Sequence, residues 1–257
     1  MNTLILLSVF CLTGVSSQSY SLAGLYNPFD SKSDAIFVNP ALLPDSRFSG
    51  VLGLRQNYLM SDLTDFHLSV SGKFWKLRAG LGLLEGGIKD IVSDYTFLAG
   101  LGMMNSFFGA GLSTRVGYLK NIEDNLTASS FSIDYGLCAR LSIFEFTFSH
   151  LNALRPSRGF TDKSEKSESE MLLMISFQVP QSVTWMLGLD RTSSKTSYRI
   201  GSEMWFTRGF GLRIGLMDRE VRLGLCLKTD TYGIDVAFGS SRELGTTVVI
   251  STNYSVR

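Results

Sequence analysis

Apolar residues alternate with small or charged ones along most of this 257-residue chain, and this period of two constrains its fold more than any other feature. Between Gly209 and Ser241 the apolar positions are Phe210, Leu212, Ile214, Leu216, Val221, Leu223, Leu225, Leu227, Tyr232, Ile234, Val236 and Phe238. The residues between them are mainly glycines and isolated charges. Successive side chains of a strand point to opposite faces, so the pattern predicts strands with one apolar face and one small, partly charged face.

The same alternation continues from Arg47 to the last residues, which indicates about fourteen strands of roughly ten residues each. The first lies around 51–54 and the last covers about 246–256. Tight turns are expected near 72–73, 105–106, 180–181 and 208–209, and long polar loops at 85–94, 121–127, 152–169, 191–197 and 240–245. An even strand number with loops at one end and turns at the other is typical of bacterial outer-membrane barrels.

The composition of the two faces decides which solvent each one meets. A soluble sandwich also alternates, but its polar face meets water and usually carries Thr, Lys, Glu and Gln. Here that face carries glycine, serine and isolated charges, which suits a crowded interior, and the other face suits lipid. In hydrocarbon every backbone amide must be hydrogen-bonded, so the sheet must close on itself. We therefore predict an all-β fold, a transmembrane antiparallel β-barrel, over residues 46–257.

Charged residues of both signs occupy the face that is predicted to line the lumen. They are Arg78, Arg115, Asp134, Glu145, Arg199, Glu203, Arg213, Arg222 and Asp235. They could line a path for an anionic or amphipathic solute. They could instead pair with one another and neutralise a packed lumen, and the near balance of signs favours this second interpretation.

Two segments precede the predicted barrel. Residues 1–17 hold an apolar run that is too short to span a bilayer, followed by small residues, which indicates an export signal peptide. Residues 18–45 contain three of the five prolines together with Phe29, Ile36, Phe37 and Leu42. This segment is too apolar for a linker, so we expect it to form a plug inside the barrel or an arm on its rim.

Nothing in the chain has the pattern of an enzyme or a metal site, so we expect no catalytic residues, no metal and no cofactor. His67 and His150 are the only histidines, and the acidic residues are scattered. The net charge of +1 gives no reason to expect a nucleic-acid partner. Cys138 and Cys226 remain after the signal peptide, as two buried thiols or as a disulfide, and the spacing favours the thiols.

Two stretches carry a resemblance to a known family. "SDAIFVNPALLP" resembles the Asn-Pro-Ala segment near the mature N-terminus of the PorV/PorQ-like outer-membrane proteins, in the superfamily of the long-chain fatty-acid transporter FadL. The matching residues are Asp34, Ala35, Asn39, Pro40 and Ala41. A second match in the middle of the chain rests on Gly111, Lys120, Asp134, Gly136 and Asn152. The chain is shorter than is usual for the group, and it ends in "TNYSVR" rather than in a terminal aromatic residue.

The resemblance implies a fourteen-stranded barrel with an internal N-terminal segment, in the outer membrane of a Gram-negative-type bacterium and in contact with its lipid. The PorV/PorQ-like group implies a component linked to type IX secretion, with secretion-machinery or cell-surface proteins as partners. The FadL superfamily implies instead a transporter whose partners are hydrophobic small molecules. Prolines after Pro44 occur only at 156 and 180, in a loop and a turn, so no strand is visibly interrupted for a lateral opening. A structural barrel with neither role is the third alternative.

Overall fold

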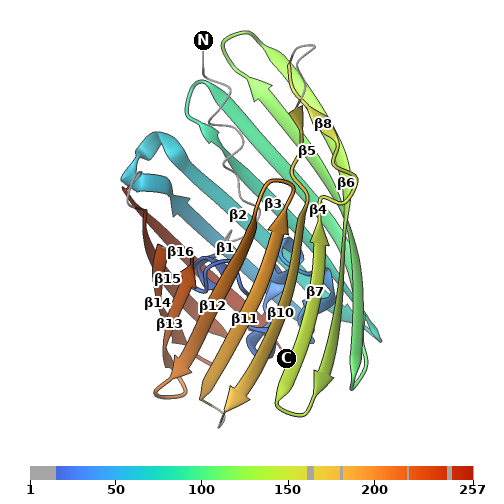
Figure 1. The fold of residues 1–257 in the computed structure, drawn as a ribbon, viewed down its shortest axis with the longest axis vertical. Coiled ribbons are helices and arrows are strands. Elements are labelled where there is room, and N and C mark those ends of the chain that lie inside the picture. The colour runs from blue at the N-terminus through green and yellow to red at the C-terminus, as the bar shows by residue number, and fades with distance from the viewer. Residues whose placement is uncertain (1–15, 161–164, 180–181, 219, 242–244, 257) are drawn as a thin grey trace.

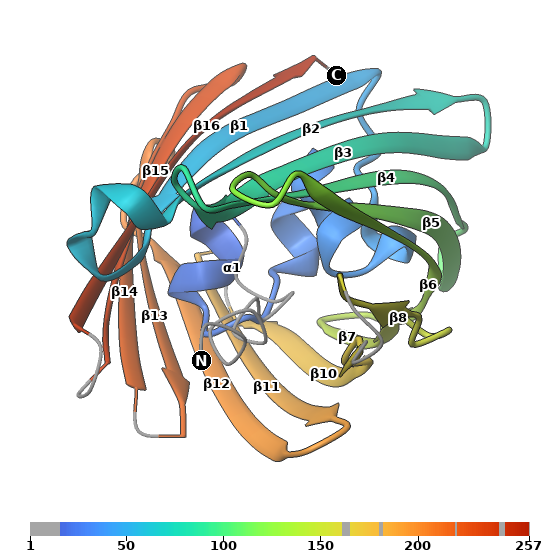
Figure 2. The ribbon, with the colours of Figure 1, turned by 90° about the horizontal axis from the view of Figure 1, so that it is seen from above.

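The described residues form one closed antiparallel β-barrel of fourteen strands. Figures 1 and 2 show the N-terminal segment inside this barrel. The computed structural model describes residues 16–160, 165–179, 182–218, 220–241 and 245–256. The ring runs in sequence order, except that β10 follows β7 and that β16 closes it against β1. The predicted fold class, a closed antiparallel barrel of the outer-membrane type, is confirmed.

The strands of the barrel differ in length, and two further strands form a small separate sheet. Their bounds are β1 Phe48–Gln56, β2 Thr64–Phe74, β3 Leu77–Ile88, β4 Val92–Met104, β5 Phe108–Asn121, β6 Leu126–Leu141, β7 Phe144–Leu151, β10 Glu170–Val179, β11 Val183–Thr192, β12 Thr196–Trp205, β13 Phe210–Met217, β14 Glu220–Lys228, β15 Tyr232–Ser241 and β16 Gly245–Val256. The small sheet pairs β8 (Ser157–Arg158) with β9 (Glu165–Lys166).

Side-chain burial alternates along the strands with a period of two. In β13 the burial pattern makes Leu212 and Ile214 exposed, whereas Gly211 and Arg213 are buried. Exposed Leu, Phe, Ile and Val cover the outside of the ring, and exposed aromatic residues such as Phe74, Trp75 and Tyr232 lie at strand ends. This distribution is that of a barrel with a lipid-facing surface and aromatic girdles.

The strand connections are shorter than the sequence suggests. Segment 85–94 is mostly strand, because β3 continues to Ile88 and β4 begins at Val92. Strand pairing explains the difference, because the glycines and charged residues at the ends of β3 and β4 continue the hydrogen-bonded ladder, with Gly86 opposite Asp94.

The two ends of the barrel differ in their connections. The end with the 152–169 connection is called the loop end below, and the opposite end, where β1 begins, is called the turn end. At the loop end β5 and β6 rise above β7, so the wall is taller on that side (Figure 1).

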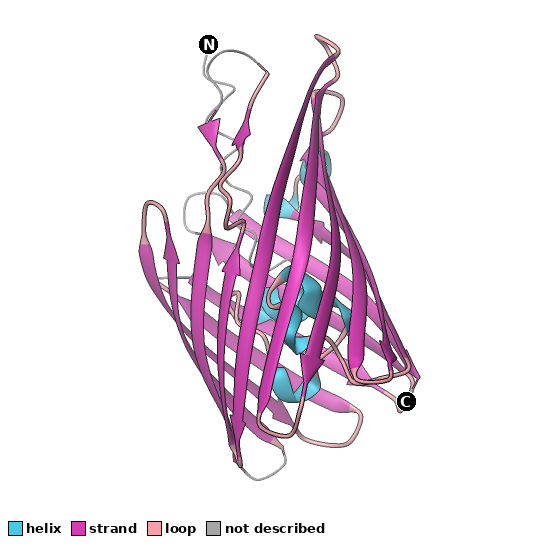
Figure 3. Cartoon of the chain, turned by 90° about the vertical axis from the view of Figure 1, so that its right-hand side faces the viewer, coloured by secondary structure: helices cyan, strands magenta, loops and turns pink. Residues whose placement is uncertain are grey.

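The N-terminal segment is the only part of the described chain, apart from η5 (Asn57–Leu59) and η6 (Ser61–Leu63), that contains helical turns. It consists of α1 (Ser17–Ser21), η2 (Pro28–Asp30), η3 (Ser33–Phe37) and η4 (Pro40–Leu42). Figure 2 shows these turns within the ring, and Figure 3 shows them in its turn-end half. In the described residues, no helix has the length and apolar character that crossing a membrane would require. Residues 16–44 are called the plug below.

Candidate functional site: the plugged lumen

The plug is almost fully buried and is held together by its own polar groups. Asn39 is the N-cap of η4, and its Oδ1 accepts the N–H of Ala41 at 2.9 Å. Its amide nitrogen donates outward to the backbone carbonyl of Phe148 at 3.2 Å, so this one side chain caps the turn and also ties it to the wall. Pro40 at the first position of the turn needs no N–H partner there. The Asn-Pro-Ala sequence thus fits a capped turn against a wall.

Asp34 is the first residue of the N-terminal motif that also contains Asn39, and its side chain is hydrogen-bonded within the plug. Its Oδ1 accepts the hydroxyl of Tyr26 at 2.7 Å, and the carbonyl of Ala35 accepts the N–H of Asn39 at 2.7 Å. Burial raises the pKa of the Asp34 carboxyl, and it also raises the pKa of Tyr26 well above its usual value, with the negative charge of Asp34 adding to the effect. All five motif residues are therefore inside the barrel, in the part of the plug that turns back on itself.

Glycines of the wall make room for the plug. A Cβ placed on Gly111 would lie 2.3 Å from the carbonyl carbon of Pro40, and one on Gly136 would lie 1.8 Å from Oδ1 of Asn39. On the opposite wall, a Cβ on Gly215 would lie 2.5 Å from the backbone nitrogen of Ala23. Since real Cβ atoms do not approach other atoms this closely, these positions accept only glycine while the plug is in place. The two stretches that carry the family resemblance meet here, through Asn39 and Gly136.

The side of the plug toward β3–β7, β10 and β11 is mainly apolar. Leu22, Leu25, Ile36, Phe37, Leu42 and Leu43 pack in one buried cluster with the wall residues Leu98, Cys138, Leu172, Met174 and Met186. Gly80 and Gly82 of β3 lie directly against Leu43, Ile36 and Phe37. Apolar contacts are not directional, so burial of surface is the main interaction on this side. Two hydrogen bonds add to it, from Asn39 to the carbonyl of Phe148 and from Arg78 to the carbonyl of Leu43.

The face of the plug toward β12–β15 is ionic. Lys32 Nζ lies 2.7 Å from Asp235 Oδ2, and Arg213 Nη1 lies 2.9 Å from the other oxygen of that carboxylate. Arg213 also pairs with Glu203, whose Oε1 accepts the side-chain N–H of Asn27 at 2.6 Å. Burial by itself lowers the pKa of Lys32, but the carboxylate of Asp235 overrides it, and the net pKa is raised.

Asp30 adds a second ionic contact by pairing with Lys228 of β14. Burial raises the pKa of its carboxyl, but the positive charges of Lys32 and Lys228 outweigh that effect and leave the pKa lowered. The plug is thus anchored on one side by charge and packed on the other side by apolar contact.

All nine charged residues that the sequence assigns to the lumen lie inside the barrel and have ionic partners. Three pairs join members of that set: Arg115–Asp134 at 2.7 Å, Arg213–Glu203 and Arg213–Asp235. The other members pair with residues outside it, as Arg78–Asp45, Arg140–Glu145, Arg199–Asp190, Arg199–Glu170 and Arg222–Glu220. This pairing supports the neutralising role. Sequence reasoning missed Lys32, which has no alternating neighbours to mark it as an inward residue.

The two histidines lie on separate strands, β2 and β7, and the two cysteines lie on β6 and β14. His67 is inward and 2% exposed, and His150 is on the outer face of β7. Cys138 of β6 and Cys226 of β14 are free and buried on nearly opposite sides of the ring, which excludes a disulfide between them. Among the described residues, no group of three or more His, Cys, Asp or Glu side chains is placed to bind a metal ion.

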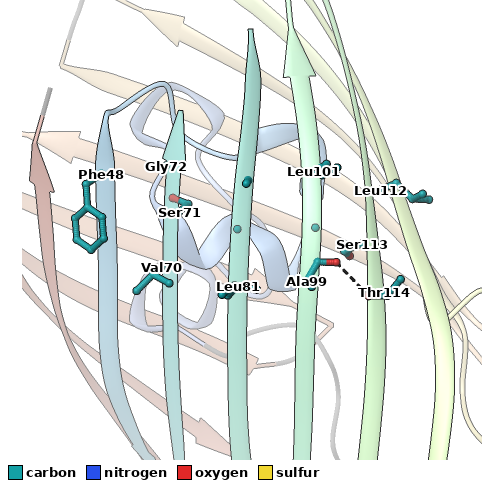
Figure 4. A pocket seen from close by; sticks show the side chains of 13 residues that line it. Phe48, Val70, Ser71, Gly72, Leu81, Ala99, Leu101, Leu112, Ser113 and Thr114 are labelled. Atoms are coloured by element: carbon teal, nitrogen blue, oxygen red, sulfur yellow. Dashed lines mark hydrogen bonds between the residues drawn. The ribbon is translucent and has the colours of Figure 1, made fainter. Parts of the chain in front are cut away.

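An apolar hollow of about 730 Å³ lies on the outer surface of β1–β5 (Figure 4). Large side chains such as Phe48, Leu81 and Leu112 border it, and its floor is made of small residues, among them Ala79, Ala99 and the backbone of Gly80 and Gly100. Gly80 faces Leu43 of the plug on its inner side. A single layer of backbone therefore separates this membrane-facing hollow from the apolar side of the plug.

A polar cluster on the outer face at the loop end was not foreseen from the sequence. His150 Nε2 lies 2.9 Å from Ser169 Oγ, and His150 Nδ1 lies 2.8 Å from the hydroxyl of Tyr135. The pairing of Tyr135 with His150 across β6 and β7 sets this arrangement, and Ser169 arrives from the long connection just before β10. Only the register of three strands brings these residues together, so no local pattern could have indicated it.

The fold and the plugged interior define the class: this is an outer-membrane-type β-barrel whose lumen holds its own N-terminal segment. No family model matches the chain, and no curated protein matches its sequence. Among solved structures, the toluene transporter TodX of Pseudomonas putida is similar, with a TM-score of 0.73 and 12% identity over 96% of this chain and 99% of that one.

Two other solved structures share the architecture. The CymD monoaromatic hydrocarbon channel gives a TM-score of 0.68 and 11% identity over 96% of this chain and 99% of that one. The outer membrane protein Omp33 of Acinetobacter baumannii gives 0.54 and 7% over 82% and 98%. At these identities the likeness shows a shared fold, which is that of Gram-negative outer-membrane barrels.

Proposed function

We propose that this protein carries small hydrophobic solutes across the outer membrane of a Gram-negative-type bacterium, to which an export signal within residues 1–17 directs it. The observation that carries the proposal is the apolar half of the plug–wall interface, where Ile36 and Leu43 lie behind Gly80 of the outer hollow and only one layer of backbone intervenes. The fold shared with hydrocarbon channels supports it.

The asymmetry of the plug explains how a hydrophobic solute would pass. An apolar molecule can replace the plug's contacts with β3–β7, because it offers the same kind of surface in exchange. It cannot replace the bond from Lys32 to Asp235, because separating that buried pair leaves a charge without its partner. The apolar side of the plug therefore moves away from the wall as the solute enters, while the ion pairs on its other side remain formed.

A reversible lock tests this mechanism. Leu43→Cys combined with Gly80→Cys joins the plug to β3, where a Cβ at Gly80 would lie 2.8 Å from the Leu43 side chain. In Gram-negative cells, whose lipopolysaccharide leaflet slows the entry of apolar solutes, we expect the oxidised double variant to take up radiolabelled toluene no faster than cells without the protein, and the reductant to restore uptake. The single variant Leu43→Cys is the matched control and should be insensitive to the reductant. Uptake by cells with the wild-type protein that equals that of cells without it would overturn the proposal.

The PorV/PorQ-like resemblance supports a second proposal, a role in handling type IX-secreted or cell-surface proteins. It rests on Asp34, Ala35, Asn39, Pro40 and Ala41, whose burial within the plug suits either function equally. Affinity purification from outer membranes separates the two. Recovery of secretion or surface proteins together with null uptake favours this role, and failure of both assays leaves a structural barrel.

A further inference from the structure

We propose that Ser169, His150 and Tyr135 form an acyl-ester hydrolase site on the outer face of the barrel, acting on lipids of the leaflet at the loop end. The imidazole of His150 forms one hydrogen bond at each ring nitrogen. Ser169 Oγ lies 2.9 Å from Nε2, and the Tyr135 hydroxyl lies 2.8 Å from Nδ1. This is the spacing that a nucleophile, its general base and an orienting group require.

The position of the cluster suits a lipid ester. Tyr135, His150 and Met171 lie opposite one another on β6, β7 and β10, and all three belong to the outward face. Toward the turn end, the same face continues with Leu137, Phe146 and Leu173, which are exposed apolar side chains. Acyl chains can pack on those residues while the ester group lies at the height of His150, near the end of β7.

A positively charged residue, Arg191, lies on the neighbouring strand β11 in register with Tyr135, His150 and Met171. Arg191 of β11 is paired with Met171, and its side chain is exposed. With strands about 4.8 Å apart, Arg191 is roughly 10 Å from His150 along the row. An arginine at that height offers a charge-assisted hydrogen bond to a phosphate group of the substrate headgroup. The favoured substrate class is therefore a phosphorylated amphiphile with fatty-acyl esters, either a glycerophospholipid or lipid A.

The reaction needs only water as co-reactant. Ser169 Oγ bonds to the acyl carbon while its proton passes to His150 Nε2, and the proton then goes to the alcohol oxygen as the ester C–O bond breaks. Water attacks the acyl-serine, gives a proton to Nε2 and releases the fatty acid, and the proton returns to Oγ. Tyr135 is a positioning residue: its oxygen accepts a hydrogen bond from the Nδ1–H of His150, and the lone pair of Nε2 therefore faces Ser169.

Labelling of the full-length protein in detergent with a fluorophosphonate probe tests the site directly. We expect the wild type to be labelled at Ser169, identified by mass spectrometry, and Ser169→Ala and His150→Ala to lose at least 100-fold of the labelling rate. Ser167→Ala, two residues away on the same connection, is the matched control and should stay within twofold. A heat-modifiability gel checks that each variant is folded.

Release of fatty acid from vesicles of phosphatidylethanolamine and from purified lipopolysaccharide distinguishes the two lipid sources. Tyr135→Phe should lower kcat about tenfold and leave KM within twofold, which a merely structural role would not do. If the tyrosine hydroxyl instead donates to Nδ1, the ring proton is on Nε2. His150 then cannot accept the proton of Ser169, and Ser169 does not react. A folded wild type with no labelling of Ser169 and no release from either lipid, or Ser169→Ala as active as the wild type, overturns the proposal.

Discussion

Gly136 of β6 lies directly against Asn39 of the plug, so closely that a Cβ at Gly136 would stand 1.8 Å from Oδ1 of that asparagine. Asn39 is at the same time the cap of η4 and a donor to the wall. The plug can therefore occupy this position only because residue 136 is a glycine and has no Cβ atom.

Gly136→Val tests this dependence. The added side chain must displace Asn39, and overpacking of this kind costs about 1–3 kcal/mol. We expect a lower temperature for loss of the fast-migrating folded form on unboiled gels, together with faster proteolysis within residues 16–44. Gly50→Val is the control, because a Cβ there meets only ordinary contacts, at 3.6 Å and beyond. Equal behaviour of the two variants would show that the plug tolerates crowding.

Lys32→Met removes the positive charge that the plug brings to Asp235. Asp235 keeps Arg213 as a partner in this variant. We therefore expect a loss of roughly 2 kcal/mol of stability, the contribution of one charge-assisted hydrogen bond, measured by urea unfolding in detergent. Lys73→Met is the matched control: its pair with Asp45 is 39% and 59% exposed, and its loss should cost less than about 1 kcal/mol. If both variants lose the same amount, the buried pair is not an anchor.

The two plug carboxyls predict opposite pH dependences. The pKa of Asp34 is raised in the folded state, so stability from this group falls as pH rises from the unfolded value of about 4 through the folded pKa. Asp34→Asn keeps an acceptor for Tyr26 and removes the buried charge. We expect it to be more stable than the wild type at pH 7 and equal to it at low pH, in thermal unfolding followed by circular dichroism.

Asp30 should respond with the opposite sign. Its pKa is lowered in the folded state, so its contribution is present above about pH 4 and is lost as pH falls through the folded pKa. Asp30→Asn is therefore expected to destabilise the barrel at pH 7, and the difference from the wild type should disappear under acid conditions. A destabilised Asp34→Asn or a stabilised Asp30→Asn at pH 7 contradicts the assignment.

The two thiols should be protected by the fold. Cys138 and Cys226 are buried and free, so a bulky maleimide should label neither in the folded barrel and both after boiling. Thr229→Cys, in the exposed turn before β15, should react before boiling and serves as the positive control. A shift in mobility on non-reducing gels would reveal a disulfide and contradict the separation of the two strands.

Much of the fold was predictable because alternation is a local property. Arg213 and Leu212 are neighbours in sequence and must face opposite sides of any strand, so the burial of one and the exposure of the other follow from the pattern. The loops were predicted less well. Gly86 and Asp94 have the composition of a loop, yet they pair as strand residues because their neighbours on β3 and β4 hold the ladder together.

A closed barrel with a glycine- and charge-lined interior follows from the order of the amino acids, because lipid accepts only one face of each strand and requires every backbone amide to be hydrogen-bonded. The partners of those glycines and charges follow instead from the three-dimensional arrangement. Gly136 admits Asn39, Asp235 binds Lys32, and Ser169 reaches His150, and each of these pairs joins residues that are distant in sequence. Strand register and the path of the plug bring them together, and no period within the chain encodes either.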